Sequence, residues 1–413
     1  MNYKYFRLYE ECYLVNGKEK SCIYDLFNEK VFHVDEDLRK ILTLTENNKS
    51  FDDVCHELNI TTTFLEEKLK EAEKFQVGGF YEKPPAIEKV TLHPDWKDNL
   101  FFKLPPQINR AFLELSNECD NNCFFCASDR YSLRFRCMGC GKDPSYNNIT
   151  ISVEKWTEYM KQLYALGVTE LYITGGNVFL DVPKLKAVIL SAKEIGFRYI
   201  NVISGNRNIN ALRQLGEVAN GVKFIIQRYL DENYKQLIES DEIIQNIDIL
   251  DKSEYCFVFL LDYYNKSLVN DIAATVKNKI KQNSFYFDYL LDNQNLTDIQ
   301  LREIKFTNSK IKLDDFSIKG KYNPCLNSTV TIKADGIITT CPGLKDYPLS
   351  KTGDLYEAIK KDNITRYSSL GCNDIEPCNK CEYRYLCSDC RYIEIKNGAQ
   401  LNQTRICDKC MVG

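Results

Sequence analysis

The chain has 413 residues, of which 44% are hydrophobic and 27% are charged, and its formal net charge is -4. This balance lacks the basic excess of a nucleic-acid-binding protein, and no uninterrupted apolar run is long enough to span a membrane, so neither partner is expected. The N-terminal sequence MNYKYFRLYEEC carries charges where a signal peptide needs apolar residues, which predicts a cytoplasmic protein. A chain of this length is expected to form two or three domains.

Residues 1–90 have the pattern of a small separate domain. Two segments rich in aromatic and β-branched residues, 6–15 and 21–34, flank the turn sequence NGKEK and predict two strands joined as a hairpin. Three helices are expected next, each opening on a capping residue such as Asp35 or Ser50. These helices are 35–44, 50–58 and 61–75. The segment GGFYEK then predicts a wing, which makes the unit winged-helix-like.

From residue 105 to residue 315, strands and helices alternate. The six expected strands are 112–117, 171–176, 199–205, 223–230, 255–262 and 285–292. Two of the helices between them have clear ends, from Ser152 to Gly167 and from Asp181 to Gly196. The pattern predicts an α/β fold with a parallel sheet, either doubly wound or curled into a partial (β/α)6 barrel like an incomplete TIM barrel. Function is expected at the carboxyl ends of the strands.

Residues 320–413 have many cysteines and few long apolar faces, so metal centres are expected to hold this tail together. Of the 18 cysteines of the chain, 15 lie at or beyond Cys119, which in a long cytosolic chain favours metal or catalytic sites over disulfides. The only histidines are His33, His56 and His93, all before these regions. All-thiolate sites for zinc or for iron-sulfur clusters are therefore expected.

Three cysteines, Cys119, Cys123 and Cys126, directly follow the first predicted barrel strand in the sequence ECDNNCFFC. Three thiolates can hold three irons of a [4Fe-4S] cluster and leave the fourth iron without a protein ligand. An open coordination position implies that another molecule binds there. The spacing, with Phe125 just before the last cysteine, resembles the signature of radical S-adenosylmethionine (SAM) enzymes. Taken alone, the triplet also fits a fragment of a zinc knuckle.

The resemblance implies a cofactor site. In the family, S-adenosylmethionine chelates the open iron, and one electron from the cluster cleaves it to a 5'-deoxyadenosyl radical. The segment YITGGN resembles the family's glycine-rich segment, so Gly175 and Gly176 are expected to bring the backbone close to the cofactor. Ser204 and Asn206 resemble positions that bind its ribose or carboxylate. The family usually has an acidic residue where this chain has Asn177, which accepts hydrogen bonds but brings no charge.

The tail resembles the SPASM domain, a C-terminal extension of radical enzymes that mature peptides and proteins. Its cysteine spacing follows the family pattern, except that the interval before Cys390 is one residue short. The resemblance implies a first auxiliary [4Fe-4S] cluster on Cys325, Cys341 and Cys390, and a second on Cys378, Cys381, Cys387 and Cys407. Either Cys372 or Cys410 completes the first set, or its last iron is open to a substrate thiolate. The alternative for these repeats is a pair of zinc ribbons.

Two further cysteines, Cys137 and Cys140 in RFRCMGCGKD, fit neither pattern. They are expected to bind a further metal, to pair as a redox dithiol, or to be plain loop residues beside the active site.

The N-terminal unit resembles the peptide-recognition element of enzymes that mature ribosomally made peptides. In that family a disordered leader peptide adds as a strand to an exposed sheet edge. The edge is expected within 5–14 or 21–33. A winged helix for dimerisation or DNA binding is the alternative, although the acidic balance of the unit disfavours DNA.

The predicted function is that of a radical SAM/SPASM maturase acting on a ribosomally synthesised precursor peptide, with flavodoxin or ferredoxin as the one-electron donor. The expected product is an intramolecular crosslink, a thioether if the first auxiliary cluster has an open iron and a carbon-carbon bond as the variant. One alternative is a sulfatase-type maturase that forms formylglycine. Another is a catalytically silent scaffold that holds iron-sulfur clusters or zinc and presents a peptide.

Overall fold

The computed structural model describes residues 3–18, 20–90, 92, 108–121, 123–126, 131–132, 137, 139–141, 151–250, 253–280, 284–291, 310–387 and 389–405. Its largest element is a ten-stranded sheet with the strand order β15-β14-β13-β6-β8-β9-β10-β11-β12-β7. Within these ranges, no helix is both long and apolar enough to cross a membrane.

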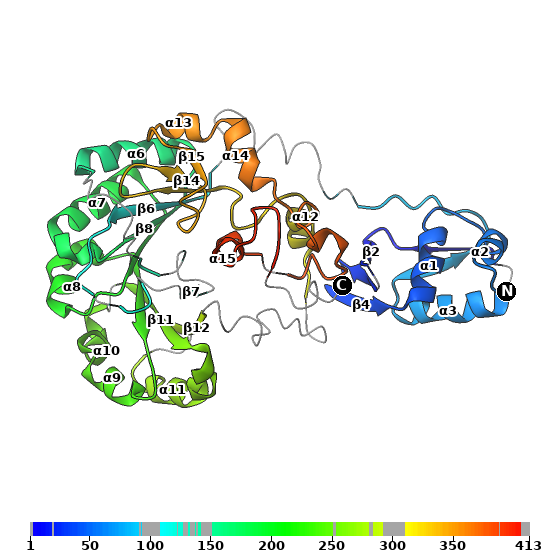
Figure 1. Ribbon diagram of the computed structural model, residues 1–413, viewed down its shortest axis with the longest axis horizontal. Coiled ribbons are helices and arrows are strands. Elements are labelled where there is room, and N and C mark those ends of the chain that lie inside the picture. The colour runs from blue at the N-terminus through cyan, green and yellow to red at the C-terminus, as the bar shows by residue number, and fades with distance from the viewer. Residues whose placement is uncertain are drawn as a thin grey trace.

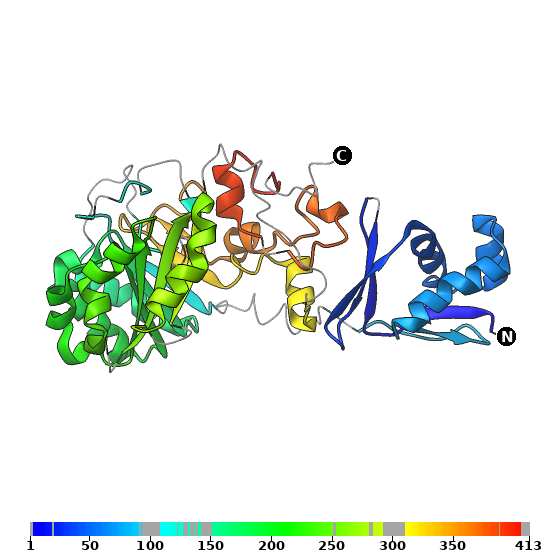
Figure 2. The same cartoon turned by 90° about the horizontal axis from the view of Figure 1, so that it is seen from below.

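Six neighbouring strands of this sheet are parallel and curve around a common core, with helices along their outer side (Figures 1 and 2). All six lie where the sequence pattern predicts them. The strands are β6 (Arg110–Ser116), β8 (Glu170–Gly175), β9 (Tyr199–Ser204), β10 (Val222–Tyr229), β11 (Glu254–Asp262) and β12 (Phe285–Leu291), and the short β7 (Tyr131–Ser132) pairs antiparallel with β12. The predicted parallel α/β sheet is thus confirmed.

The helices between these strands begin and end at the expected signals. The Ser152 side chain accepts a hydrogen bond from the backbone of Lys155, and the Asp181 side chain accepts one from Lys184. Gly196 ends its helix in the left-handed region, with φ +103°. The segments are α6 (Val153–Ala165), η1 (Val178–Asp181), α7 (Val182–Ile195), α8 (Ile209–Leu215), η2 (Gly216–Ala219), α9 (Tyr234–Ser240), α10 (Glu242–Gln245), η3 (Ile247–Leu250), η4 (Tyr263–Leu268) and α11 (Val269–Val276).

The first half of the cysteine-rich tail is built into the barrel sheet. Strand β13 (Thr329–Ile332) pairs in parallel with β6, and β14 (Ile338–Thr339) and β15 (Pro348–Ser350) extend the sheet beyond it. Side chains such as Val330, Ile338 and Leu355 belong to the same core as α6 and α7. The expectation that metal centres alone hold the tail is therefore wrong for this part. The tail helices are α12 (Leu313–Lys321), α13 (Leu355–Ala358), α14 (Lys361–Ser368), η6 (Cys378–Lys380) and α15 (Arg391–Lys396).

The N-terminal unit has four strands before its helices, where two were predicted. The long second segment breaks because the Asp25 side chain accepts hydrogen bonds from the backbone of Phe27 and Asn28 and stabilises a turn. The GGFY segment pairs with the first strand. The elements are β1 (Tyr5–Leu8), β2 (Cys12–Asn16), β3 (Ser21–Asp25), β4 (Lys30–Val34), α1 (Glu36–Thr45), α2 (Phe51–Leu58), α3 (Thr62–Lys74) and β5 (Gly78–Tyr81).

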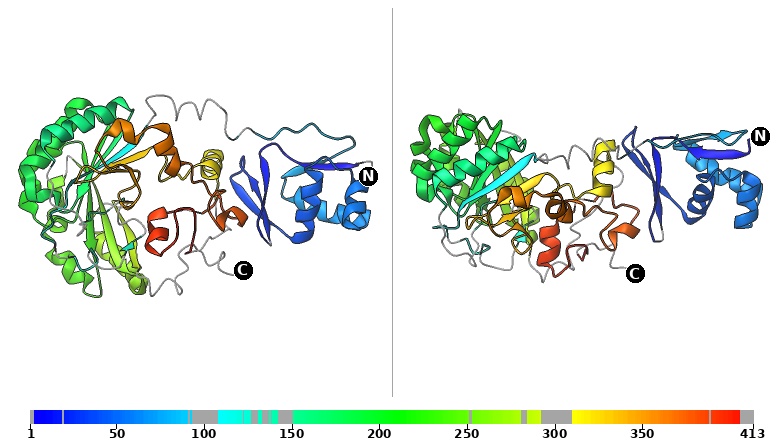
Figure 3. Two further views of the ribbon diagram at one scale, coloured as in Figure 1. Left: turned by 45° about the horizontal axis from the view of Figure 1, so that its top comes forward. Right: turned by 90° about the horizontal axis from the view of Figure 1, so that it is seen from above.

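This unit packs against the tail, on the side away from the barrel helices (Figure 3). Tyr24 of β3 packs with Phe316 of α12 and with Tyr385, and the rings of Phe316 and Tyr385 stack with centroids 3.9 Å apart. The Tyr24 hydroxyl donates to the carbonyl of Glu382 at 2.8 Å. The three-stranded sheet β2-β3-β4 is thereby held next to the cysteine-rich segment 378–387.

A buried ion pair joins the tail to the barrel and gives a stability prediction. Lys333 Nζ lies 2.6 Å from Glu114 Oε1 of β6 and also donates to the carbonyl of Pro342 at 2.8 Å. Replacing Lys333 with methionine leaves a buried, unpaired carboxylate, so we expect a loss of about 3–5 kcal/mol. Urea unfolding of the metal-free protein measures this loss. The double variant Lys333→Met/Glu114→Gln should unfold at higher urea than Lys333→Met, and equal midpoints would contradict the role of the pair.

Candidate active site at the carboxyl ends of the barrel strands

Two glycines allow the triplet loop to fold over the end of the neighbouring strand. A Cβ on Gly175, which has φ +130°, would lie 2.2 Å from the carbonyl oxygen of Ser116, and one on Gly176 would lie 2.0 Å from that of Glu118. The backbone amides of Gly176 and Asn177 donate to these same two carbonyls, each at 2.8 Å. Both glycines are therefore required by contact with the protein's own loop. The sequence analysis had instead assigned them to close contact with the cofactor.

The three cysteines of the triplet are half-buried and lie close to one another. Burial, and then the nearby thiols of Cys126 and Cys119, raise the pKa of Cys123 to about 11. The neighbouring Phe125 is buried in a cluster with residues such as Phe112 and Ile203 from the inner face of the sheet. The structure thus brings together the three thiols and the aromatic residue that the sequence pattern singled out.

A cavity opens beside the triplet loop. It has a volume of about 290 Å³, and its lining includes Asp120, Cys123, Phe125 and Gln227. A second cavity of about 520 Å³ lies next to it, at the end of β10, and shares two lining residues with it, Arg207 and Tyr229. These volumes suit a small-molecule site, and the position is where parallel α/β sheets bind ligands.

Asn177 is buried, and its side chain already has partners within the protein. Its Nδ2 donates to Asp120 Oδ1 at 2.7 Å, and its Oδ1 accepts from the backbone of Phe179 at 3.2 Å and from Ser204 Oγ at 3.4 Å. The carboxylate next to this position is that of Asp120, which is exposed and lines the smaller cavity. Its place beside Cys119 in the sequence is the signal that could have identified it.

Ser204 and Asn206 are both buried and stabilise the loop after β9. Ser204 Oγ accepts a hydrogen bond from the backbone of Asn206 at 2.9 Å. The Asn206 side chain donates to the carbonyl of Asn208 at 2.8 Å and accepts from the backbone of Asn208 at 3.1 Å. The side chains at the two positions predicted to bind the cofactor therefore shape the loop that borders the larger cavity.

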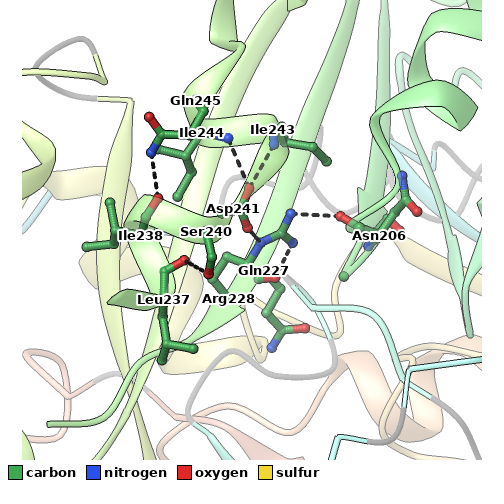
Figure 4. Close-up of polar contacts among 12 residues, drawn as sticks. Asn206, Gln227, Arg228, Leu237, Ile238, Ser240, Asp241, Ile243, Ile244 and Gln245 are labelled. Atoms are coloured by element: carbon green, nitrogen blue, oxygen red, sulfur yellow. Dashed lines mark hydrogen bonds and ion pairs between the residues drawn. The ribbon is translucent and has the colours of Figure 1, made fainter. Parts of the chain in front are cut away.

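Arg228 is a residue of this site that the sequence analysis missed. It is buried at the end of β10, pairs with the carboxylate of Asp241, and donates to the carbonyls of Asn206 and Gln227, each at 2.8 Å (Figure 4). Asp241 also caps α10 by accepting from the backbone of Ile243 and Ile244 (Figure 4). Arg228 thus ties the ends of β9 and β10 to the start of α10 around the larger cavity.

Gln227 was also missed, and it carries an unused donor. The residue is 4% exposed and lines the smaller cavity. Its Oε1 accepts from the Cys140 thiol at 3.4 Å, whereas its Nε2 has no hydrogen-bond partner among the described residues. Because a buried donor without a partner costs about 1–3 kcal/mol, this amide is poised to donate to a ligand in the cavity.

The predicted auxiliary cysteines lie in two groups. Cys341 lies near Cys325, and Cys390 lies near both. The second group lines a small cavity and consists of Cys372, Cys378 and Cys387, with Cys381 two residues before Tyr383 in the adjoining core. Cys372 therefore lies with the second set, although the first set was one place where it was expected. Cys407 and Cys410 lie outside the described residues.

None of the groupings of His, Cys, Asp and Glu side chains in the described ranges is tight enough to hold a single metal ion. A cubane cluster has its irons at separate corners, so its thiolates lie farther apart than the ligands of one ion.

Comparisons with protein-family models and with curated proteins found no match to this sequence. Among solved structures, SuiB of Streptococcus suis bound to the precursor peptide SuiA aligns at 14% identity over 98% of this chain and 100% of its own, with a TM-score of 0.43. BtrN in complex with AdoMet and 2-DOIA aligns at 13% identity over 68% and 98%, with a TM-score of 0.38. The tagged protein anSMEcpe with bound AdoMet aligns at 13% identity over 72% and 93%, with a TM-score of 0.51.

The alignment with anSMEcpe shows a shared fold. The residues present fit a thiolate-bound group with a small ligand beside it: Cys123 and Phe125 of the triplet loop line a cavity of ligand size, which also contains the Asp120 carboxylate and the orphaned amide donor of Gln227.

The two glycines at the end of β8 give a direct test of how this fold positions the triplet loop. Replacing Gly176 with alanine places a Cβ against the Glu118 carbonyl, so the loop must lift and expose Cys119. We expect Cys119 of the metal-free protein to be alkylated several-fold faster, as measured by mass spectrometry, with Cys256 as the internal reference. Gly79→Ala, where φ is not positive and a Cβ would meet only ordinary contacts of 3.4–3.6 Å, is the matched control. Equal Cys119 rates in the two variants would refute this account of Gly176.

Proposed function

We propose that this protein is a radical SAM maturase that installs an intramolecular crosslink in a ribosomally made precursor peptide. The observation that carries the proposal is a loop with three neighbouring thiols, of which Cys123 lines a cavity at the carboxyl ends of a sheet with this fold. When bound, a [4Fe-4S] cluster and S-adenosylmethionine supply a carbon-centred radical that removes a hydrogen atom from the substrate. The work of the chain is to hold these groups and to exclude water.

Within this proposal each polar group of the smaller cavity has a task. Cys119, Cys123 and Cys126 hold the cluster as thiolates. Asp120 supplies the negative charge that Asn177 lacks and pairs with the cofactor ammonium, while Asn177 holds the Asp120 carboxylate in place through the 2.7 Å hydrogen bond. The free amide of Gln227 donates to an oxygen of the cofactor.

Strand β4 is the edge that we assign to the leader peptide. Strand β3 is paired on both sides, by β2 and by β4, so residues 21–25 offer no free edge. In the part of the chain that the structure describes, β2 and β4 are the two edges of this sheet, and each has one strand neighbour. Phe32 of β4 stacks on Phe75, just after α3, with ring centroids 4.6 Å apart. An added strand along β4 would therefore lie beside an aromatic surface.

The position of β4 supports a peptide substrate over a small molecule. His33 Nδ1 of β4 lies 3.1 Å from the Tyr383 hydroxyl, which belongs to the segment of the second cysteine group. A peptide that pairs with β4 would thus run alongside the tail before its core segment enters the barrel. A sulfatase-type substrate would leave this edge without a role.

Anaerobic reconstitution tests the proposed chemistry. We expect about 12 irons per chain, from three cubane clusters, with matching labile sulfide. Under reducing conditions the protein should convert S-adenosylmethionine to 5'-deoxyadenosine, and a variant with the triplet changed to alanine should lose this activity. Zinc without labile sulfide, or intact clusters with no 5'-deoxyadenosine, would refute the proposal. A separate binding measurement tests the assigned edge. A peptide encoded beside the gene should bind the reconstituted protein, and the double variant Phe32→Ser/Phe75→Ser should lose this binding but still cleave S-adenosylmethionine.

Gln227 gives a second prediction for cofactor binding. Replacing Gln227 with methionine keeps its volume but removes the free donor, so the Kd for S-adenosylmethionine should rise about 10-fold, which corresponds to one lost hydrogen bond. Equilibrium dialysis with the reconstituted protein measures the Kd. Gln214→Met, at an exposed position of α8, is the control and should bind as the parent does. An unchanged Kd in the Gln227 variant would remove this residue from the site.

A further inference from the structure

The segment that holds Cys137 and Cys140 lies across the carboxyl ends of the barrel strands. The backbone amide of Gly141 donates to the carbonyl of Gly175 at 2.7 Å, and Cys140 Sγ contacts Gln227. Burial, and then the thiols of Cys126, Cys123 and Cys119, raise the pKa of Cys140. Cys140 therefore lies beside the triplet.

Cys137, three residues earlier, lies at a different group of thiols. Burial, and then the nearby thiols of Cys341 and Cys325, raise the pKa of Cys137 to about 12. Cys390 lies near the same thiols. Burial raises its pKa, and Cys341, Cys325 and Cys137 raise it further. Such effects weaken quickly with distance, so these four thiols share one region of the protein.

The elements that carry these four cysteines converge from three parts of the chain. Cys325 precedes β13, Cys341 follows β14, and Cys390 immediately precedes α15. Because β13 pairs with β6, this group lies against the barrel strand that leads into the triplet loop. Cys137 packs from the barrel side, next to the cluster that contains Phe112 of β6.

The surroundings of this group suit a negatively charged ligand. Burial raises the pKa of Cys137, Cys325 and Cys341, and a nearby cation opposes this rise in each case: the Arg110 guanidinium at Cys137 and Cys325, and Lys333 at Cys341. Arg110 Nη2 donates to Thr329 at 3.2 Å, but Arg110 Nε is buried and has no hydrogen-bond partner among the described residues. A buried cationic N–H without an acceptor, near Cys137 and Cys325, fits an anionic group held by these thiols.

Two cysteines were expected as candidates to complete this set, and one of them, Cys372, lies elsewhere, whereas Cys410 is outside the described residues. Cys372 lies near Cys378, with Arg384 and Lys319 close to it, and lines the same small cavity as Cys387. It therefore belongs with the second auxiliary group. Among the described cysteines, Cys137 is the one that lies near Cys325, Cys341 and Cys390.

We propose that Cys137 is the fourth thiolate ligand of the first auxiliary [4Fe-4S] cluster. The inference rests on the proposed function, since that cluster is part of it, and it sharpens the substrate class. Four thiols release their protons as the cluster binds, and all four irons then have a ligand from the chain. No iron is left for a substrate thiolate, so this cluster takes part by electron transfer, and the carbon-carbon variant of the crosslink is favoured over a thioether formed on that iron.

The test isolates the auxiliary clusters in the full-length chain. In a background with Cys119, Cys123 and Cys126 changed to alanine, iron and labile sulfide are measured first, and zinc without sulfide would refute the proposed function itself. The reduced protein is then titrated with imidazole, a small ligand for an open iron, and pulsed electron paramagnetic resonance detects nitrogen coupled to a cluster.

Cys137→Ala should create an open iron, so the nitrogen coupling should rise above that of the background, or the protein should lose about four irons as the whole cluster is released. Cys140→Ala, in the same segment, should change neither quantity, and Cys137→Ser should suppress the coupling because its oxygen can occupy the iron. Unchanged coupling and unchanged iron in Cys137→Ala would overturn the inference, and so would an equal loss of iron in Cys140→Ala.

Discussion

The close approach between the end of β8 and the loop that follows β6 is the constraint on which the site depends. Gly175 and Gly176 leave room for the carbonyls of Ser116 and Glu118, and two backbone hydrogen bonds then fasten the loop. Because the loop is held down at this point, Asp120 reaches the side chain of Asn177, and Cys123 lines the smaller cavity together with Asp120 and Gln227. The local backbone contact thus positions the loop that carries the donor groups of the site.

The same strand connects the site to the tail. β6 pairs with β8 on one side and with β13 on the other, and the buried Lys333–Glu114 pair joins β13 to β6. The first auxiliary cysteines flank β13 and β14, so their position relative to the triplet is determined by sheet hydrogen bonds. The N-terminal unit is joined differently, through aromatic side chains such as Tyr24 and Phe316, which leaves its β4 edge free of sheet pairing on one side within the described residues.

The sequence predicted the barrel strands well because buried parallel strands are continuous apolar runs bounded by glycine and polar residues. Helix-capping residues such as Ser152 and Gly196 could be predicted for a different reason: the backbone groups that they contact lie within a few residues in the sequence. The missed residues depend on distant segments: Arg228 pairs with Asp241, and Gln227 meets Cys140, 87 positions away in the chain. The break after β3 was missed because it depends on a turn stabilised by one side chain, Asp25. Cysteine spacing alone could not place Cys372 or Cys137, because spacing does not say which groups converge in space.

The segment from Cys137 to Cys140 gives the two thiol regions a covalent connection. Cys140 lies beside the triplet and Cys137 beside the first auxiliary group, so four consecutive residues reach both. If Cys137 is a ligand, the auxiliary cluster fixes the position of Cys137, and Cys140, three residues later, contacts the Gln227 side chain. Assembly of the auxiliary cluster would then affect how the Gln227 side chain is positioned in the smaller cavity. Because no iron would remain for a substrate sulfur, the choice of reacting residue would rest on how the peptide passes from β4 to the barrel.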